Sequence, residues 1–220
     1  MPAAIDRPAT RRIGFEAGDA ALTLVDQGGV IVAEPGYAVQ GTAGLTLGAD
    51  ALAATRQQPL AASARHWREL GGPPSPAAGR LPPAATLVAA HLDRLAALAG
   101  ACDGYVLAVP GYWGPAQAAA LLALCAERGL AIDGAVDAAI AVARADHPGH
   151  TVLYLEAALQ GLVLTRLASG EAAAIAAREV LPQPGIEGLQ RVAAEFIARR
   201  FVEASRYDPL HGPASEQRLF

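Results

Sequence analysis

The stretch between residues 105 and 137 constrains the fold of this chain more than any other part. It opens with the apolar run Tyr-Val-Leu-Ala-Val, which predicts a buried strand at 105–109. A proline–glycine turn follows, and a helix is predicted from Pro115 to the residue before Gly129, because proline suits a first helical turn and glycine a helix end. Another strand is predicted at 131–135. A strand, a helix and a strand in this order predict a right-handed crossover between parallel strands.

Two groups of short strands flank this crossover and indicate an α/β fold. The first group is predicted at residues 12–16, 20–25 and 30–33. The second group is predicted at residues 151–156, 161–167 and 171–181. Apolar spacing predicts helices at residues 47–56, 60–70, 83–99, 137–145 and 185–203. The last of these is expected to cover the second group of strands with a core face that contains Phe196, Ile197 and Phe201.

The chain is predicted to form two lobes of unequal size. The first lobe spans 1–147 and contains a proline-rich loop at 71–85, where prolines remove backbone donors and fix φ. A partial second lobe spans 148–220. A last helix is expected to begin with Ser215 near its N-cap, and the chain stops on apolar residues without a C-cap. We therefore expect a piece of a longer polypeptide.

Composition excludes several classes of function. The net charge is −4 and the sequence pI about 5.7, so there is no basic field for nucleic acid or an anionic membrane. All 17 basic residues are arginines, which leaves no catalytic lysine. No apolar run approaches the ~20 residues of a membrane span. Cys102 and Cys125 have neither disulfide-framework nor zinc-site spacing, which favours a reducing cytoplasm.

The crossover carries a family resemblance. Its turn Val109-Pro-Gly-Tyr-Trp113, with the spacing to Gly129 and Leu130, resembles the DnaK-type seventy-kilodalton heat-shock chaperones of the actin-like ATPase superfamily. The resemblance implies an actin-like, ribonuclease H-like α/β fold, with the first lobe and the beginning of the second. The family ligand is ATP with magnesium. We interpret the turn itself as scaffold beside the cleft, with Tyr112 and Trp113 as packing residues and little contact with the chemistry.

The resemblance places a nucleotide site between two hairpins. The family's first hairpin, Gly-Ile-Asp-Leu-Gly-Thr-Thr, corresponds here to Gly14-Phe-Glu-Ala-Gly-Asp-Ala20, and the second, Asp-Leu-Gly-Gly-Gly-Thr, to Glu156-Ala-Ala-Leu-Gln-Gly161. The implied nucleotide-binding residues are therefore Glu16, Gly18, Asp19, Glu156 and Gly161. Carboxylates at hairpin ends are also common as solvated turn residues, so both interpretations stay open.

The departures from the family pattern argue against nucleotide chemistry. Ala20 and Ala21 supply no hydroxyl, Asp19 places negative charge against a polyphosphate, and Leu159 puts a branched side chain where bare backbone should approach it. The segment that carries a catalytic carboxylate in the family falls at Asp137-Ala-Ala-Ile140, so that carboxylate is absent or displaced by one residue. We expect neither ATP hydrolysis nor a bound cofactor, and no catalytic or metal-binding residues are assigned.

Three functions remain open at this point. The first is a chaperone-like pseudo-ATPase that acts as a scaffold or adaptor and binds a protein partner. The second is a fragment of an ATP-binding DnaK-like molecular chaperone. The third is an actin-like platform of a secretion or pilus assembly, which only the shared fold supports.

Overall fold

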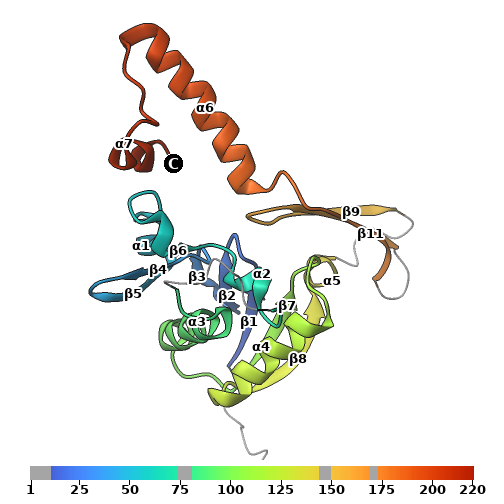
Figure 1. Cartoon of the computed structure of the whole chain (residues 1–220). Coiled ribbons are helices and arrows are strands. Elements are labelled where there is room, and N and C mark those ends of the chain that lie inside the picture. The colour runs from blue at the N-terminus through green and yellow to red at the C-terminus, as the bar shows by residue number, and fades with distance from the viewer. Residues whose placement is uncertain (1–10, 74–80, 144–149, 169–172) are drawn as a thin grey trace, which may run out of the picture.

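The computed structural model describes residues 11–73, 81–143, 150–168 and 173–220 (Figure 1). The described chain has a mixed α/β fold with three separate sheets. Parts of the proline-rich loop, the end of the helix predicted at 137–145 and the first residues of the strand predicted at 171–181 lie outside the described residues. Among the described residues, no helix has the length and apolar character needed to span a bilayer.

The main sheet has five strands in the order β3-β2-β1-β7-β8. Its strands are β1 (Arg12–Ala17), β2 (Leu22–Asp26), β3 (Gly29–Glu34), β7 (Gly104–Val109) and β8 (Ile132–Asp137). The first three form an antiparallel meander, as the turn signals predicted, and β7 and β8 pair in parallel on the other side of β1. The predicted crossover is therefore confirmed, because a helix connects β7 to the neighbouring parallel strand β8.

Two helices cover one face of this sheet (Figure 1). They are α3 (Ala84–Ala99) and α4 (Pro115–Glu127). Pro115 occupies the first turn of α4, and Gly129 follows its end with a φ of 68°. Ile13 and Phe15 on β1 alternate with less buried neighbours and pack in one apolar core with Leu92 of α3. Each such large apolar side chain contributes roughly 1.5–3 kcal/mol when fully buried.

Residues 38–69 form a small unit that the sequence did not reveal. The strands β4 (Ala38–Gly41), β5 (Gly44–Leu47) and β6 (Ala62–Ser63) make an antiparallel sheet in the order β5-β4-β6. The helical pieces are short: α1 (Gly48–Leu52), the 3₁₀ turn η1 (Pro59–Ala61) and α2 (His66–Glu69). The prediction of longer helices at 47–56 and 60–70 is therefore wrong, since a proline and two interposed strand residues interrupt the helical pattern.

The third sheet is an antiparallel meander, as predicted. It contains β9 (Val152–Ala157), β10 (Leu162–Ala168) and β11 (Ala174–Leu181) in the order β11-β10-β9. Before it, α5 (Ala138–Val142) begins at Asp137, whose side chain accepts a hydrogen bond from the Ala139 amide. Leu153 and Leu155 on β9 are 63% and 61% exposed, so one face of this sheet is open to solvent along β9.

The long helix α6 (Ile186–Ser205) corrects one prediction. It has the predicted length, but Phe196, Ile197 and Phe201 are 59%, 40% and 49% exposed and form no core face. The buried positions are Ala194 and Ala198 instead. Figure 1 shows α6 extending away from the β9–β11 sheet, so it does not cover that sheet as expected. An amphipathic pattern predicts which face can be buried, and burial also needs a partner opposite it.

The C-terminal helix α7 (Pro213–Leu219) packs near α1 rather than on α6 (Figure 1). The Arg56 amide donates to Gln217 Oε1 at 2.9 Å, and the Arg56 guanidinium lies 3.9 Å from the centre of the Phe220 ring. The N-cap of α7 is Gly212, and Ser215 lies in the first turn, where its hydroxyl donates to the Gly212 carbonyl. The expected N-cap at Ser215 is therefore shifted by one turn.

Candidate functional site

The two hairpins that the resemblance singled out contact each other directly. One is the β1–β2 turn around Asp19, and the other is the β9–β10 turn around Leu159. The Leu159 amide donates a hydrogen bond of 3.0 Å to Asp19 Oδ1, and Asp19 is fully buried. Its other oxygen, Oδ2, accepts no hydrogen bond from the described residues. A carboxylate of the first hairpin thus occupies a backbone donor of the second.

A cavity of about 160 Å³ lies beside this contact. Four of the five predicted site residues line it: Glu16, Gly18, Asp19 and Glu156. The remaining walls come mostly from small side chains of the same two hairpins and from Tyr154. The structure therefore brings these four residues together, from segments about 140 positions apart in the sequence.

Gly161 is not among the residues that line this cavity. A Cβ atom at this position would lie 2.6 Å from the Leu181 carbonyl oxygen, closer than real Cβ contacts allow. The glycine is therefore needed where the β9–β10 turn passes the end of β11. Its role in the structure is a close backbone approach, and a role in nucleotide binding stays a prediction.

The turn after β7 contacts both hairpins, which corrects its interpretation as scaffold with little contact to the site. The Gly111 amide donates to Glu156 Oε2 at 2.9 Å. The hydroxyl of Tyr112 accepts a 3.3 Å hydrogen bond from the Asp19 amide. Trp113 is partly buried against the main core, in agreement with its interpretation as a packing residue. Sequence reasoning placed these residues correctly on a turn but had no signal for their partners.

Burial disfavours the charged form of the carboxylates at this site. Burial raises the pKa values of Asp19 and Glu16 above the ordinary range. Burial also raises the pKa of Glu156, the hydrogen bond from Gly111 opposes this rise, and the negative charge of Glu16 adds to it. Burial likewise raises the pKa of Tyr112, which stays protonated at neutral pH. A cluster of acids that disfavours its own charges also disfavours a further anion, and the positive charge of Arg68 acts on Asp19 in the opposite direction.

One ion pair joins β8 to β11 beside Gly111. Arg178 donates to Asp137 Oδ1 at 2.7 Å and to the Thr165 hydroxyl at 3.0 Å. Both side chains of the ion pair are about four-fifths buried. This arginine is therefore committed to structural partners, and sequence analysis did not single it out. Asp137 caps α5 and pairs with Arg178, so it is not placed as a free carboxylate.

The site consists of carboxylates that accept hydrogen bonds from backbone amides of the chain itself. Magnesium needs several oxygen ligands in near-octahedral geometry. Among residues 11–73, 81–143, 150–168 and 173–220, no three histidine, cysteine or acidic side chains are arranged to hold a metal ion. The backbone amides of Gly111 and Leu159 at this site already donate to Glu156 and Asp19. These hydrogen bonds join the two hairpins and the turn after β7.

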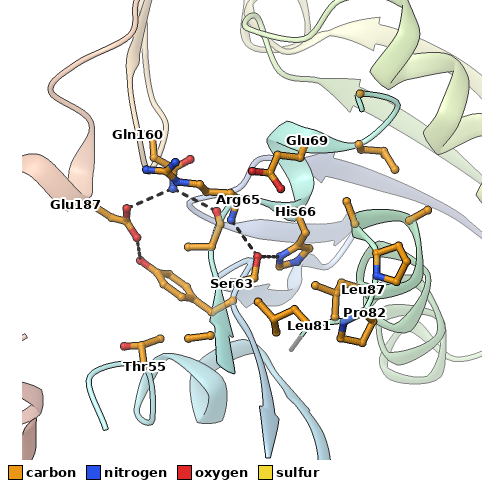
Figure 2. A pocket seen from close by; sticks show the side chains of 18 of the residues that line it. Thr55, Ser63, Arg65, His66, Glu69, Leu81, Pro82, Leu87, Gln160 and Glu187 are labelled. Carbon is orange, nitrogen blue, oxygen red and sulfur yellow. Dashed lines mark hydrogen bonds between the residues drawn. The ribbon is translucent and has the colours of Figure 1, made fainter. Parts of the chain in front are cut away.

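A second and larger cavity of about 950 Å³ surrounds α2 (Figure 2). Figure 2 shows Leu81, Pro82 and Leu87 on one side of it and Gln160 and Glu187 on the other. The residues at α2 itself lie between these two sides. This cavity was not predicted from the sequence, because it is formed by segments that are far apart in the chain.

Two histidines beside this cavity are buried without charge. The rings of His66 and His91 stack with centres 5.2 Å apart, and Trp67 packs against both. Burial lowers the pKa of His66 to about 3 and that of His91 to about 4. His66 Nδ1 lies 3.0 Å from the Ser63 hydroxyl. Both rings are therefore neutral at physiological pH, and both are buried against Trp67.

Comparison of the chain with models of known protein families gave no match, and comparison with curated proteins gave none either.

Proposed function

We propose that this chain is a degenerate, chaperone-like module of the actin-like ATPase fold that does not hydrolyse ATP and serves as a scaffold or adaptor for a protein partner. The observation that carries the proposal is the hydrogen bond between Asp19 and the Leu159 amide. In an ATP-binding member of this fold, backbone amides of the hairpins approach phosphate oxygens. Here the Leu159 amide donates to a carboxylate of the chain itself.

The fold supports the proposal through its order of elements. An antiparallel meander is followed by helical crossover strands added in parallel, and a second meander follows with a long helix after it. This succession is what the resemblance to DnaK-type proteins implies for a first lobe and the beginning of a second. The resemblance implies a larger peripheral subdomain at the position of the proline-rich loop 71–85, so we infer that this subdomain is reduced here.

The repulsion between a bound phosphate and the Asp19 carboxylate can be estimated from their charges. A phosphate charge about 4 Å from the Asp19 carboxylate would be repelled by roughly 4 kcal/mol at an effective dielectric constant of ~20. An energy of this size weakens binding by about a thousandfold. The phosphate would also have to displace Asp19 from a hydrogen bond that is already formed. Both effects act against nucleotide binding.

The same contacts support a scaffold role, because they join the hairpins without a ligand. The Ile186 and Glu187 amides at the start of α6 donate to the carbonyls of Ala158 and Leu159. Tyr37 donates from its hydroxyl to Glu187 at 2.9 Å, which links the β3–β4 connection to α6. Because hydrogen bonds within the chain hold the two hairpins together, their relative position is fixed without nucleotide. A protein partner would therefore meet the same surface whether or not nucleotide is present.

A thermal-unfolding experiment with nucleotide tests the proposal. A ligand at a hundred times its Kd stabilises a protein by about 2.7 kcal/mol. We expect millimolar Mg-ATP and Mg-ADP to leave the unfolding temperature unchanged, and we expect no phosphate release above the no-enzyme rate. A saturable rise in unfolding temperature with either nucleotide would instead support an ATP-binding chaperone module.

A further inference from the structure

The 950 Å³ cavity around α2 is distinct from the hairpin site, and its lining divides into two chemically different sides. Sites for small organic ligands typically have ~300–1,000 Å³ and combine apolar walls with a few placed polar groups. The cavity falls within that range. It shares no lining residue with the small cavity between the hairpins. A ligand here would therefore not compete with the Asp19 contact.

One side of the cavity is apolar. It is formed by Leu70 after α2, Leu87 on α3 and Leu124 on α4, with Leu81 and Pro82 completing it (Figure 2). Leu70 and Leu87 are only 1% exposed and form the base of this side, so the surface open to a ligand comes mainly from the partly exposed Leu81, Pro82 and Leu124. His66 adds no charge, because burial keeps its ring neutral. This side offers mostly hydrocarbon contact, and the neutral His66 ring adds one ring nitrogen, Nε2, that has no hydrogen-bond partner among the described residues.

The other side carries charged groups, of which some already have hydrogen-bond or ion-pair partners and others have none among the described residues. Glu187 accepts hydrogen bonds on both oxygens, from Tyr37 at 2.9 Å and from Gln160 at 3.3 Å. Arg65 and Arg191 also line the cavity, and neither guanidinium has an ion-pair partner within the described residues. With Arg56 and Glu69, the lining carries three arginines and two glutamates.

The charge balance favours an anion at this side of the cavity. Glu187 is satisfied by two neutral donors, and Arg56 lies against Glu216 and Phe220. Arg65 directly precedes α2, and Figure 2 shows it between Glu187 and His66. A planar guanidinium matches the geometry of a carboxylate, to which it can donate two parallel hydrogen bonds.

We propose that this cavity binds an amphipathic carboxylate, with its hydrocarbon chain against Leu81, Pro82 and Leu124 and its carboxylate at Arg65. The class of ligand is a fatty acid or a comparable acyl carboxylate. The hydrocarbon side supplies most of the affinity by apolar burial, and Arg65 supplies the preference for the acid over an uncharged analogue.

The experiment uses cis-parinaric acid, a fatty acid that fluoresces when it enters an apolar site, and its methyl ester. We expect saturable binding of both probes by the wild-type chain, with the acid preferred about fivefold, the upper end for an exposed ion pair. Ala123→Trp introduces a bulky ring at an exposed position that lines the cavity, and it should reduce binding of both probes. Arg65→Gln should remove the preference for the acid and leave ester binding unchanged.

Matched variants on α6 separate this site from other apolar surfaces. Ala193→Trp and Arg199→Gln change exposed residues of α6 that do not line the cavity, and they should bind both probes as the wild type does. No saturable binding to the wild type would overturn the proposal. Equal binding to the Ala123→Trp and Ala193→Trp variants would place the probe on another surface and overturn it as well. An acid preference that survives Arg65→Gln would refute the assigned carboxylate position.

Discussion

Substitution of Asp19 separates the two effects of its side chain on the contact between the hairpins. The carboxylate satisfies the Leu159 amide, and its buried charge is unfavourable. Asp19→Ala leaves the buried amide without an acceptor, which costs about 1–3 kcal/mol. Asp19→Asn keeps an oxygen acceptor and removes the charge. We therefore expect the asparagine variant to be at least as stable as the wild type at pH 7, and the alanine variant to be less stable than the asparagine variant by about 1–3 kcal/mol.

The pH dependence of the same variants shows whether the negative charge of Asp19 raises or lowers the free energy of unfolding. Burial raises the pKa of Asp19 in the folded protein, so the folded state binds the proton more tightly than the unfolded state. This contribution to the free energy of unfolding is fully present below the unfolded pKa of about 3.8 and is lost as the pH rises through the folded pKa. The advantage of Asp19→Asn over the wild type should therefore grow between pH 4 and pH 7.

Urea unfolding at several pH values measures these differences. Asp50→Asn, at an exposed aspartate of α1, serves as the control and should change stability little at any pH. If Asp19→Asn lost as much stability at pH 7 as Asp19→Ala, the negative charge itself would be required at the hairpin contact. That result would refute the reasoning, because it would mean that the site stabilises an ionised carboxylate.

Three further predictions concern the core, a turn and the long helix. The folded pKa values of His66 and His91, about 3 and about 4, lie below the unfolded value, so the unfolded state binds more protons and acid destabilises the fold. Between pH 7 and pH 5 each ring should remove roughly 2 kcal/mol from the free energy of unfolding, and a wild-type profile without this loss would contradict the buried neutral pair. Gly161→Ala should cost about 1–3 kcal/mol in urea unfolding through overpacking, whereas Gly134→Ala, which has open space around it, should be nearly neutral; equal effects would contradict the close approach. Phe196→Ser should change stability by less than about 0.5 kcal/mol and reduce the binding of an apolar dye, and a large loss of stability would show that α6 is packed.

The strands of the two meanders and the crossover could be predicted from the sequence because local signals specify them. Alternating apolar residues mark β1, and a proline and a glycine mark the two ends of α4. The β4–β5 hairpin was missed, since its strands have four residues each and contain glycines with low strand propensity. Its neighbour α1 ends after five residues, although the apolar spacing continues to residue 56.

At the candidate site, too, the sequence predicted local features but not the contacts between segments that are far apart in the chain. The resemblance implied one site for Glu16, Gly18, Asp19, Glu156 and Gly161, and the first four of these residues line one cavity. The donors that Asp19 and Glu156 accept from could not be predicted, because hydrogen bonds between segments so far apart leave no pattern in either one. The exposed apolar row on α6 had the opposite problem: its spacing is regular, but burial depends on what lies opposite it.

The account rests on the backbone amides of Leu159 and Gly111, which donate to carboxylates of the chain rather than to phosphate. A titration of ¹⁵N-labelled protein with Mg-ATP, followed by amide resonances in solution, observes these two groups directly. We predict that neither resonance moves in a saturable way and that the Leu159 amide exchanges slowly with solvent without nucleotide. Saturable shifts of both amides at micromolar nucleotide would contradict the central claim, because they would show that phosphate displaces the carboxylates.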